Sequence, residues 1–417
     1  MIKNNILYTN FLNWEFSVTK AEGSYIWNQN NKKLIDFTSG WNVTNLGWNN
    51  TEVIEAIVKQ TKINTFIPMW LSDQVQVKYA KDLTNSMPKQ LDLAVRATGG
   101  TDANDKALML ARAITKRKKV IGCYDTYHGH SFGTISIGYR PEHVVNESPI
   151  VPEFIKLNFP VTTENETKDK KVLKDFLADL EELLKKEDIA CVITEAGVIS
   201  GWGSTYIAPY GYLKEIRKLT KKYGTLLILD EVGTGFSRCG QLWGMQIEKV
   251  VPDMVTLAKG ITNGSGAMGA VVLKSSYGEE LLSNSKTHST FGWMPLPVAA
   301  ACAVIKIHKR DKVWEKAKVD GIYVLDQLKK ELGSLSNIGT INGIGLEIGL
   351  TFVKAKKTKG RDNDMAKKVI STAYKKGLHL ALGGEGNIQI MPPLTTSRKV
   401  LDEGLEMLIE SVKTCSK

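Results

Sequence analysis

The chain has 417 residues, of which 42% are hydrophobic and 24% are charged, a composition that is ordinary for a globular protein with one large and one smaller domain. No apolar run approaches the ~20 residues that a membrane-spanning helix needs, and the mixed polar start predicts a cytoplasmic protein with no membrane partner. The net charge is +11, but lysines alternate with glutamates along helices instead of forming basic blocks, which argues against a nucleic-acid partner.

The predicted elements begin with a hairpin over residues 20–37 and helices over 52–62 and 74–85. From residue 93 onward, short apolar strands alternate with helices. We expect strands over 93–97, 120–124, 189–195, 226–230 and 254–258, and helices over 103–116, 172–186, 212–223 and 296–308. Such alternation predicts a mostly parallel sheet with helices on both faces. The last part of the chain mixes helices and short strands, which is typical of a smaller α+β domain.

Two predicted strands end in residues that suggest chemistry. The strand over 226–230 ends in the carboxylate of Asp230, and the strand over 254–258 is followed by Lys259. Ligands of such sheets bind at the carboxyl ends of strands, so we expect the two side chains to share a site. A lysine that forms a Schiff base, with a carboxylate that keeps a pyridine nitrogen protonated, is what pyridoxal 5'-phosphate chemistry requires. A turn aspartate and a surface lysine are the alternative, but burying an unpaired lysine after an apolar strand is costly.

A glycine-rich turn joins the strand over 93–97 to the next helix. Gly99 and Gly100 let the backbone approach an anion, Thr101 offers a hydroxyl, and the helix start offers free N–H groups. These features predict a phosphate site. An ordinary turn in which Thr101 or Asp102 caps the helix explains the same residues.

Tyr127, His128, Gly129 and His130 follow another apolar strand. Two histidines at this spacing suggest a metal, but no cysteine or carboxylate stands at ligand spacing, and we expect no metal site. The five cysteines are dispersed and odd in number, without a C-x-x-C pair, which indicates reduced thiols. The aromatic ring could instead stack on a planar cofactor, with loop packing as the alternative.

In their order along the chain, these segments resemble class III pyridoxal-phosphate-dependent aminotransferases of fold type I. The motifs are Asp36-Phe37-Thr38-Ser39-Gly40, Asn45-Leu46-Gly47, Gly100-Thr101-Asp102-Ala103-Asn104, Tyr127-His128-Gly129, Asp230-Glu231-Val232, Thr256-Leu257-Ala258-Lys259, Ser289-Thr290-Phe291-Gly292, Gly343-Ile344-Gly345 and Pro392-Pro393-Leu394. The resemblance implies a large domain over 61–305 with a mostly parallel seven-stranded sheet flanked by helices. A smaller α+β domain would combine the N-terminal segment 1–60 with residues 306–417.

The resemblance also implies roles for individual residues. Lys259 would bind the cofactor and move the proton between substrate and cofactor carbons, and Asp230 would pair with the ring nitrogen. The remaining cofactor contacts would come from Val232 and Tyr127 on the two ring faces, Gly100 and Thr101 at the phosphate, and His128. Thr290 would reach the phosphate of a neighbouring subunit, which implies a homodimer with shared active sites and, beyond it, a possible tetramer.

One departure from the family concerns the substrate. Members specific for amino acids usually have an arginine where Gln389 stands, and it holds the α-carboxylate through two hydrogen bonds. The glutamate that gates this arginine has no clear counterpart in residues 195–203. Trp41 and Trp70 stand in segments that line the substrate pocket in relatives, with core packing as the alternative.

These observations predict an aminotransferase that works by a ping-pong mechanism, related to the amine and ω-transaminases. We expect it to take the amino group from a primary amine or ω-amino donor and to pass it to an oxo acid such as pyruvate, or to a ketone. Two alternatives stay open: an amino-acid racemase or epimerase that uses the same Lys259 and Asp230, and an α-amino-acid aminotransferase in which Arg140 or another arginine replaces the missing one. A non-catalytic binding protein is not favoured, because both chemical residues are present.

Overall fold

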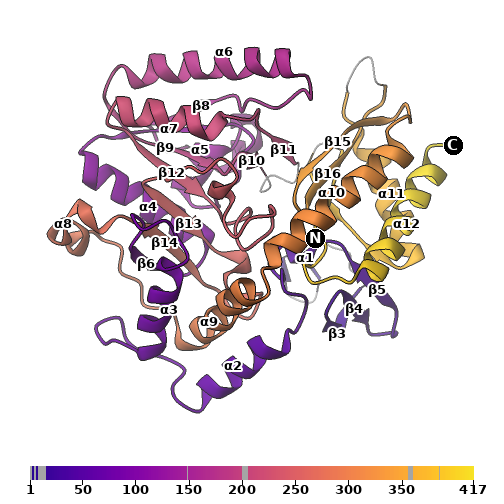
Figure 1. Cartoon of the computed structure of the whole chain (residues 1–417), viewed down its shortest axis with the longest axis horizontal. Coiled ribbons are helices and arrows are strands. Elements are labelled where there is room, and N and C mark those ends of the chain that lie inside the picture. Colours follow the sequence, from indigo (N-terminus) through magenta and orange to yellow (C-terminus); the bar gives the residue numbers. More distant parts are fainter. Residues whose placement is uncertain are drawn as a thin grey trace.

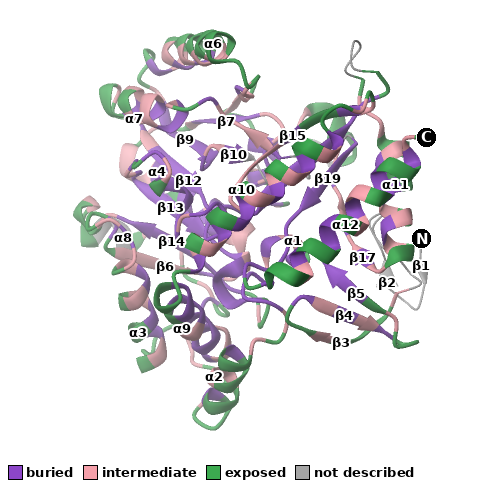
Figure 2. Ribbon diagram, turned by 45° about the vertical axis from the view of Figure 1, so that its right-hand side comes forward, coloured by how far each residue is buried: buried purple, intermediate pink, exposed green. Residues whose placement is uncertain are grey.

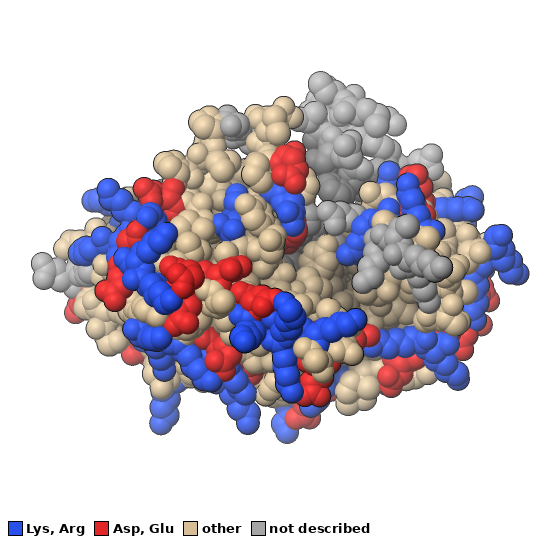
Figure 3. Space-filling view, turned by 90° about the horizontal axis from the view of Figure 1, so that it is seen from above, with Lys and Arg blue, Asp and Glu red and all other residues tan. Residues whose placement is uncertain are grey.

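The computed structural model of the chain describes residues 2–3, 6–7, 16–147, 149–199, 205–355, 360–384 and 386–417. It has a larger part built around a wide sheet and a smaller part that carries the C-terminal helices (Figure 1). Among the described residues, no helix is long and apolar enough to cross a membrane. On the face drawn in Figure 3, Lys and Arg side chains are interspersed with Asp and Glu, as the mixing of charges in the sequence predicts.

A seven-stranded sheet forms the centre of the larger part. Its strands lie in the order β6 (Leu93–Ala97), β14 (Gly269–Leu273), β13 (Met254–Leu257), β12 (Leu226–Asp230), β9 (Ile189–Glu195), β7 (Lys119–Cys123) and β8 (Phe154–Leu157). All pairings from β13 to β8 are parallel, and only β14 runs antiparallel to both of its neighbours. The predicted mostly parallel sheet is therefore confirmed.

Helices cover both faces of this sheet. Neighbouring residues of β9 point to opposite faces of the sheet. Ile193 packs into the core beneath α4 (Gly100–Thr115), and Val192 packs into the core on the other face. The strands are buried between helices whose outer surfaces are exposed (Figure 2). The other helices of this part are α2 (Thr51–Thr61), α3 (Gln74–Thr84), α5 (Phe132–Gly138), α6 (Glu166–Leu184), α7 (Tyr212–Lys222), α8 (Glu279–Asn284) and α9 (Pro295–Arg310).

The smaller part joins segments from both ends of the sequence. Its antiparallel sheet has the order β15 (Ile338–Ile344), β16 (Glu347–Phe352), β19 (Asn387–Ile390) and β18 (Ala381–Leu382), and its helices are α10 (Val313–Leu332), α11 (Asn363–Lys376) and α12 (Arg398–Cys415). A second sheet contains β3 (Val18–Glu22), β4 (Tyr25–Asn28), β5 (Lys33–Asp36) and β17 (Leu378–His379). Parallel pairing of β5 with β17 ties the N-terminal hairpin to the C-terminal region. The predicted division at residues 60 and 305 stays a prediction, and α9 runs across its second boundary.

Short elements complete the described chain. They are β1 (Ile2–Lys3), β2 (Ile6–Leu7), β10 (Val198–Ile199), β11 (Tyr206–Ile207) and α1 (Ser39–Asn42). The last of these is not an ordinary helix. Ser39, Gly40, Trp41 and Asn42 all have positive φ, between 47° and 67°, so that α1 is a left-handed turn.

Candidate active site

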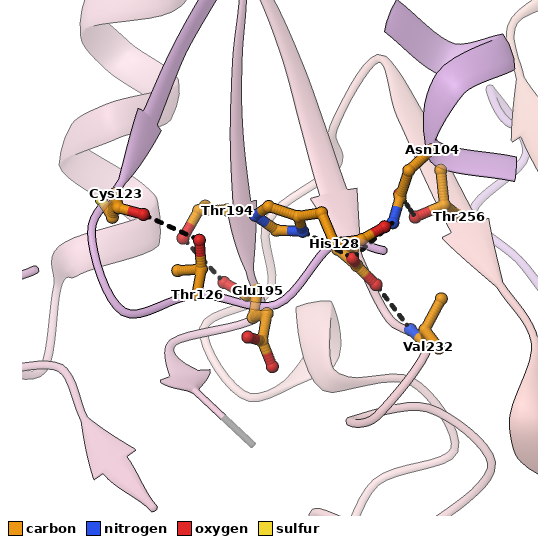
Figure 4. Close-up of polar contacts among 9 residues, drawn as sticks. Asn104, Cys123, Thr126, His128, Thr194, Glu195, Val232 and Thr256 are labelled. Atoms are coloured by element: carbon orange, nitrogen blue, oxygen red, sulfur yellow. Dashed lines mark hydrogen bonds and ion pairs between the residues drawn. The ribbon is translucent and has the colours of Figure 1, made fainter. Parts of the chain in front are cut away.

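The carboxylate of Asp230 stands at the end of β12 and is only 2% exposed. Its Oδ2 accepts hydrogen bonds from Asn104 Nδ2 at 2.8 Å and from His128 Nδ1 at 2.7 Å. Its Oδ1 accepts one from the backbone N–H of Val232 at 2.9 Å. These donors come from α4, from the loop after β7 and from the turn after β12, as Figure 4 shows. Three donors on three segments fix the orientation of the carboxylate.

Asn104 has a larger part in this network than the sequence suggested. It is 1% exposed, its Nδ2 also donates to the carbonyl of His128 at 2.8 Å, and its Oδ1 accepts from Thr256 Oγ1 at 2.6 Å. It therefore links α4, the loop after β7, β12 and β13. The sequence motif contained Asn104 and Thr256 without a role for either. The spacing offered a signal, because Asn104 stands four residues after Gly100 and so on the same face of the helix.

Lys259 follows β13 at the same edge of the sheet. Asp230 in β12 pairs with Thr256 in β13, and Lys259 comes three residues after Thr256. Its φ is +47°, a left-handed conformation that costs free energy for a residue other than glycine. Within the part of the chain that the structure describes, no hydrogen bond or ion pair holds its Nζ. A lysine whose nitrogen must react needs this freedom.

The start of α4 is open to an anion. Gly99 is the N-cap and supplies no side-chain hydrogen bond, and a Cβ at Gly99 would meet no atom within 4 Å. The cap is therefore neither Thr101 nor Asp102, one of which the ordinary-turn alternative requires, and the carboxylate of Asp102 accepts from the N–H of Thr98 at 2.8 Å. Thr101 instead lies against Gly129, where a Cβ would approach its Oγ1 to 2.4 Å. The unsatisfied N–H groups suit a phosphate.

Two more of the predicted cofactor residues lie beside these groups. Val232 packs on Gly100, where a Cβ would lie 3.1 Å from Val232 Cγ1. Burial and, after it, the charge of Asp230 raise the pKa of Tyr127, whose hydroxyl hydrogen-bonds to His130 Nδ1 at 2.8 Å.

The residues present fit pyridoxal phosphate. Asp230 would hold the ring nitrogen, the start of α4 with Gly100 and Thr101 would hold the phosphate, and Lys259 would hold the aldehyde carbon. His128 lies behind Asp230 and would orient the carboxylate. When bound, this cofactor supplies a ring that accepts electrons from the substrate carbon. Beside that carbon, Lys259 Nζ would take up and return the proton.

The substrate side of the site brings together two of its three predicted residues. Gln389 in β19 is fully buried, and its Oε1 accepts from Trp41 Nε1 at 2.7 Å. Its Nε2 donates to Glu347 Oε1 at 3.2 Å. Glu347 had no role in the sequence prediction, because nothing local distinguishes it from a strand residue near a turn.

Two predicted site residues lie apart from this cluster. Trp70 is 76% exposed, so it is neither in the core nor against Gln389. Thr290 is exposed as well, and within the described residues no hydrogen bond joins it to the groups around Asp230. Their roles stay predictions. Among the described residues, no group of three His, Cys, Asp or Glu side chains is placed to hold a metal ion.

Comparison with known proteins gives the family. The model of the family described as aminotransferase class III matches residues 8–412. Acetylornithine aminotransferase of Bacillus anthracis is 31% identical over 95% of this chain and 94% of that protein. Leucine/methionine racemase of Thermococcus litoralis is 29% identical over 94% and 89%, and putrescine–pyruvate aminotransferase of Pseudomonas aeruginosa is 30% identical over 93% and 88%.

A solved structure agrees with these relatives. Taurine:2-oxoglutarate aminotransferase of Bifidobacterium kashiwanohense, in complex with PLP and glutamate, matches with a TM-score of 0.89 and 28% identity, over 96% of this chain and 93% of that one. The matches extend over nearly the whole chain, and the predicted fold, enzyme class and cofactor are confirmed. The chain belongs to the class III aminotransferases of fold type I and is a transaminase that uses pyridoxal 5'-phosphate.

Proposed function

We propose that this transaminase takes its amino group from a primary amine or an ω-amino compound, whose reacting amine does not stand beside a carboxylate. The amino group then passes to an oxo acid such as pyruvate, or to a ketone, by a ping-pong mechanism. The observation that carries the proposal is Gln389. Its neutral amide is fully buried and hydrogen-bonds to Trp41 and Glu347, at the position where amino-acid-specific relatives use arginine.

Two arginines that could replace the missing one are engaged elsewhere, which supports the proposal. Arg140 forms two hydrogen bonds to Asp125, from Nε at 2.8 Å and from Nη2 at 2.6 Å. Arg238 is fully buried and donates to the carbonyls of Leu346 and Pro392 and to Asn45 Oδ1. A substrate carboxylate would have to displace these partners. The proposal therefore disfavours an α-amino-acid aminotransferase that uses either arginine.

A half-reaction tests the proposal. The purified protein, loaded with cofactor, is mixed with butylamine or 1-phenylethylamine without an acceptor, and the visible absorbance of the lysine-bound cofactor is followed. We expect stoichiometric loss of this absorbance and its return when pyruvate is added. Lys259→Ala is the control, because without the lysine nitrogen neither the starting absorbance nor turnover can form.

The other outcomes separate the alternatives. Loss of absorbance with L-alanine but with no carboxylate-free amine, diamines included, would contradict the proposal and mean that another group binds the α-carboxylate. Absorbance that persists with every donor, together with loss of optical activity of leucine or methionine, would indicate a racemase. That outcome needs a direct test because a racemase is among the relatives.

We also propose that the protein is a homodimer whose active sites take residues from both subunits. Thr290 supports this, because it is exposed and stands apart from the cofactor residues of its own chain. Next to it, Phe291 is 59% exposed and contacts the ring of Phe66, with centroids 6.4 Å apart. An exposed apolar surface beside a residue that the family uses across subunits is what a shared site requires.

A further inference from the structure

A buried carboxylate lies beside Gln389. Glu347 is the first residue of β16 and is 0% exposed. Gln389 in β19 pairs with Gly349 in β16, so the side chain of Glu347, two residues before Gly349, is on the same face of the sheet as Gln389. Where amino-acid-specific relatives have the positive charge of an arginine, this chain has the neutral amide of Gln389 next to the carboxylate of Glu347.

The partners of Glu347 are all neutral. Its Oε2 accepts from Asn42 Nδ2 at 2.6 Å, and its Oε1 accepts from Gln389 Nε2 at 3.2 Å and Thr205 Oγ1 at 3.4 Å. Among the described residues, no Lys or Arg nitrogen lies within 4 Å of this carboxylate. A buried carboxylate without a directly bound cation is costly to keep ionised, and a cation that binds it would lower that cost.

Glu347 also lies within the electrostatic reach of the active site. Burial raises the pKa of its carboxyl, while the charge of Arg238, the hydrogen bond from Asn42 and the charge of Lys259 act in the opposite direction. The hydrogen bond from Gln389, which itself accepts from Trp41, joins Glu347 to the two substrate residues that lie together. A bound cation would further favour the ionised carboxylate.

The left-handed turn α1 carries side chains that contact Glu347 and Gln389. Three of its residues with positive φ, namely Ser39, Trp41 and Asn42, are not glycine, and it costs free energy to hold them in this conformation. Hydrogen bonds from Ser39 N to Asp36 Oδ2 at 3.1 Å and from Ser39 Oγ to the carbonyl of Met391 at 2.7 Å hold the turn. These contacts fix the turn. It places Asn42 against Glu347 and Trp41 against Gln389.

Asn42 adds a buried acceptor that is unsatisfied among the described residues. Its Nδ2 donates to Glu347, but its Oδ1 is buried and has no hydrogen-bond partner among the described residues. Oδ1 and Nδ2 belong to one amide group, so this free acceptor lies close to the carboxylate. An ammonium group has three N–H donors and no acceptor, which matches the acceptors that the carboxylate and this amide oxygen offer on two side chains in contact.

We propose that Glu347, with Asn42, binds a second protonated amino group of the donor, so that the preferred donor is an α,ω-diamine. One amine would react at Lys259 while the other would lie against Glu347. The inference rests on the proposed function and narrows it to a donor class. It also implies that the carboxylate of an oxo-acid acceptor binds away from Glu347, because like charges at this point repel.

Donors of equal length that differ only at the far end test the inference. At the end that would face Glu347, butylamine has a methyl group, 1,4-diaminobutane has an ammonium group and 4-aminobutyrate has a carboxylate group. We expect kcat/KM in the half-reaction to be highest for the diamine and lowest for the amino acid. Diamines of three to six carbons, each compared with its monoamine, then show which length spans the distance from Lys259 to Glu347.

Three variants assign the preference to the carboxylate. In Glu347→Gln, the ratio of kcat/KM for diamine over monoamine should fall at least about tenfold, mainly through KM for the diamine, and KM for pyruvate should fall. Glu347→Asp keeps the charge and should retain more of the ratio. Glu248→Gln is the matched control, since Glu248 is 6% exposed, accepts from the backbone N–H groups of Gly211 and Lys214, and lies outside the site.

The outcomes distinguish this inference from the proposed function. Equal turnover of monoamine and diamine by the unmodified protein would overturn the inference and leave the amine transaminase standing. An unchanged ratio in Glu347→Gln, with Glu248→Gln normal, would mean that Glu347 is a protonated structural acid. Reaction with α-amino acids alone would overturn both.

Discussion

Gln389 and Glu347 share a hydrogen bond, so a change at one residue alters the charge that surrounds the other. An arginine introduced by Gln389→Arg would lie against the carboxylate of Glu347 and be neutralised by it. In the double variant Gln389→Arg/Glu347→Gln, no carboxylate competes for the guanidinium. We therefore predict that only the double variant gains reaction with α-amino acids, by at least about tenfold in kcat/KM for L-alanine over the single variant.

The measurement is the loss of cofactor absorbance with L-alanine, compared across the unmodified protein, both single variants and the double variant. Glu347→Gln alone is the control, because it removes the repulsive charge without adding a cation. If Gln389→Arg alone reacts with L-alanine as fast as the double variant, Glu347 does not control the charge around residue 389.

At the level of single residues, the sequence predicted the groups that end strands. Asp230 ends the apolar strand β12 and Lys259 comes shortly after the apolar strand β13, and the carboxyl ends of parallel strands meet at one edge of the sheet. Glu347 could not be predicted in this way. Its contact with Asn42 joins residues 305 positions apart and depends on the pairing of β16 with β19 and on the strained turn α1. No local pattern encodes such a contact.

Among the elements, the turn between β15 and β16 decides where Glu347 lies. Gly345 in this turn has a φ of +59°, and a Cβ there would lie 2.5 Å from the carbonyl oxygen of Arg238 and from the N–H nitrogen of Gly240. Leu346 N donates to the carbonyl of Arg238 at 3.0 Å, and Arg238 Nη1 donates back to the carbonyl of Leu346 at 3.0 Å. The loop after β12 therefore holds the turn that precedes Glu347.

We predict that Gly345→Ala lowers the free energy of unfolding by about 2–4 kcal/mol, because a left-handed alanine costs about 1 kcal/mol and the crowding against backbone atoms costs about 1–3 kcal/mol more. Urea denaturation of the protein loaded with cofactor measures it. Gly23→Ala is the matched control, since Gly23 has a φ of +56° and a Cβ there would meet nothing within 4 Å. Equal losses in the two variants would contradict a close contact at this turn.

Periodicity predicted most elements to within a few residues but left their directions open. The helix expected over 103–116 begins at Gly100, because Gly99 rather than Thr101 or Asp102 is its cap. The strand β14 was missing from the prediction. Its Ala-Val-Val-Leu run is buried on both faces and pairs antiparallel with β13 and β6. A continuous apolar run carries no information about strand direction, so the sheet order needs the three-dimensional structure.

For the whole molecule, an exposed apolar surface bears on how the protein assembles. Two segments of the chain expose large apolar side chains and meet through the contact of Phe66 with Phe291. The exposed members of this surface are Ile63, Phe66, Met69, Trp70, Leu71 and Phe291, with exposures from 38% for Met69 to 76% for Trp70. Monomeric proteins rarely expose so many large apolar groups together. The proposed homodimer would cover them, and it would bring Thr290 and Trp70 to a neighbouring active site.

We predict that Phe291→Asp converts the dimer to a monomer, because a charge in the centre of an apolar interface is costly to desolvate. Light scattering after size-exclusion chromatography measures the mass, and the absorbance of retained cofactor measures the site. Val319→Asp, at a position that is 60% exposed on α10, is the control and should leave both unchanged. A dimer that survives Phe291→Asp would place the interface elsewhere. A monomer that keeps its cofactor and full activity would contradict shared active sites, because Thr290 could then contribute nothing across the interface.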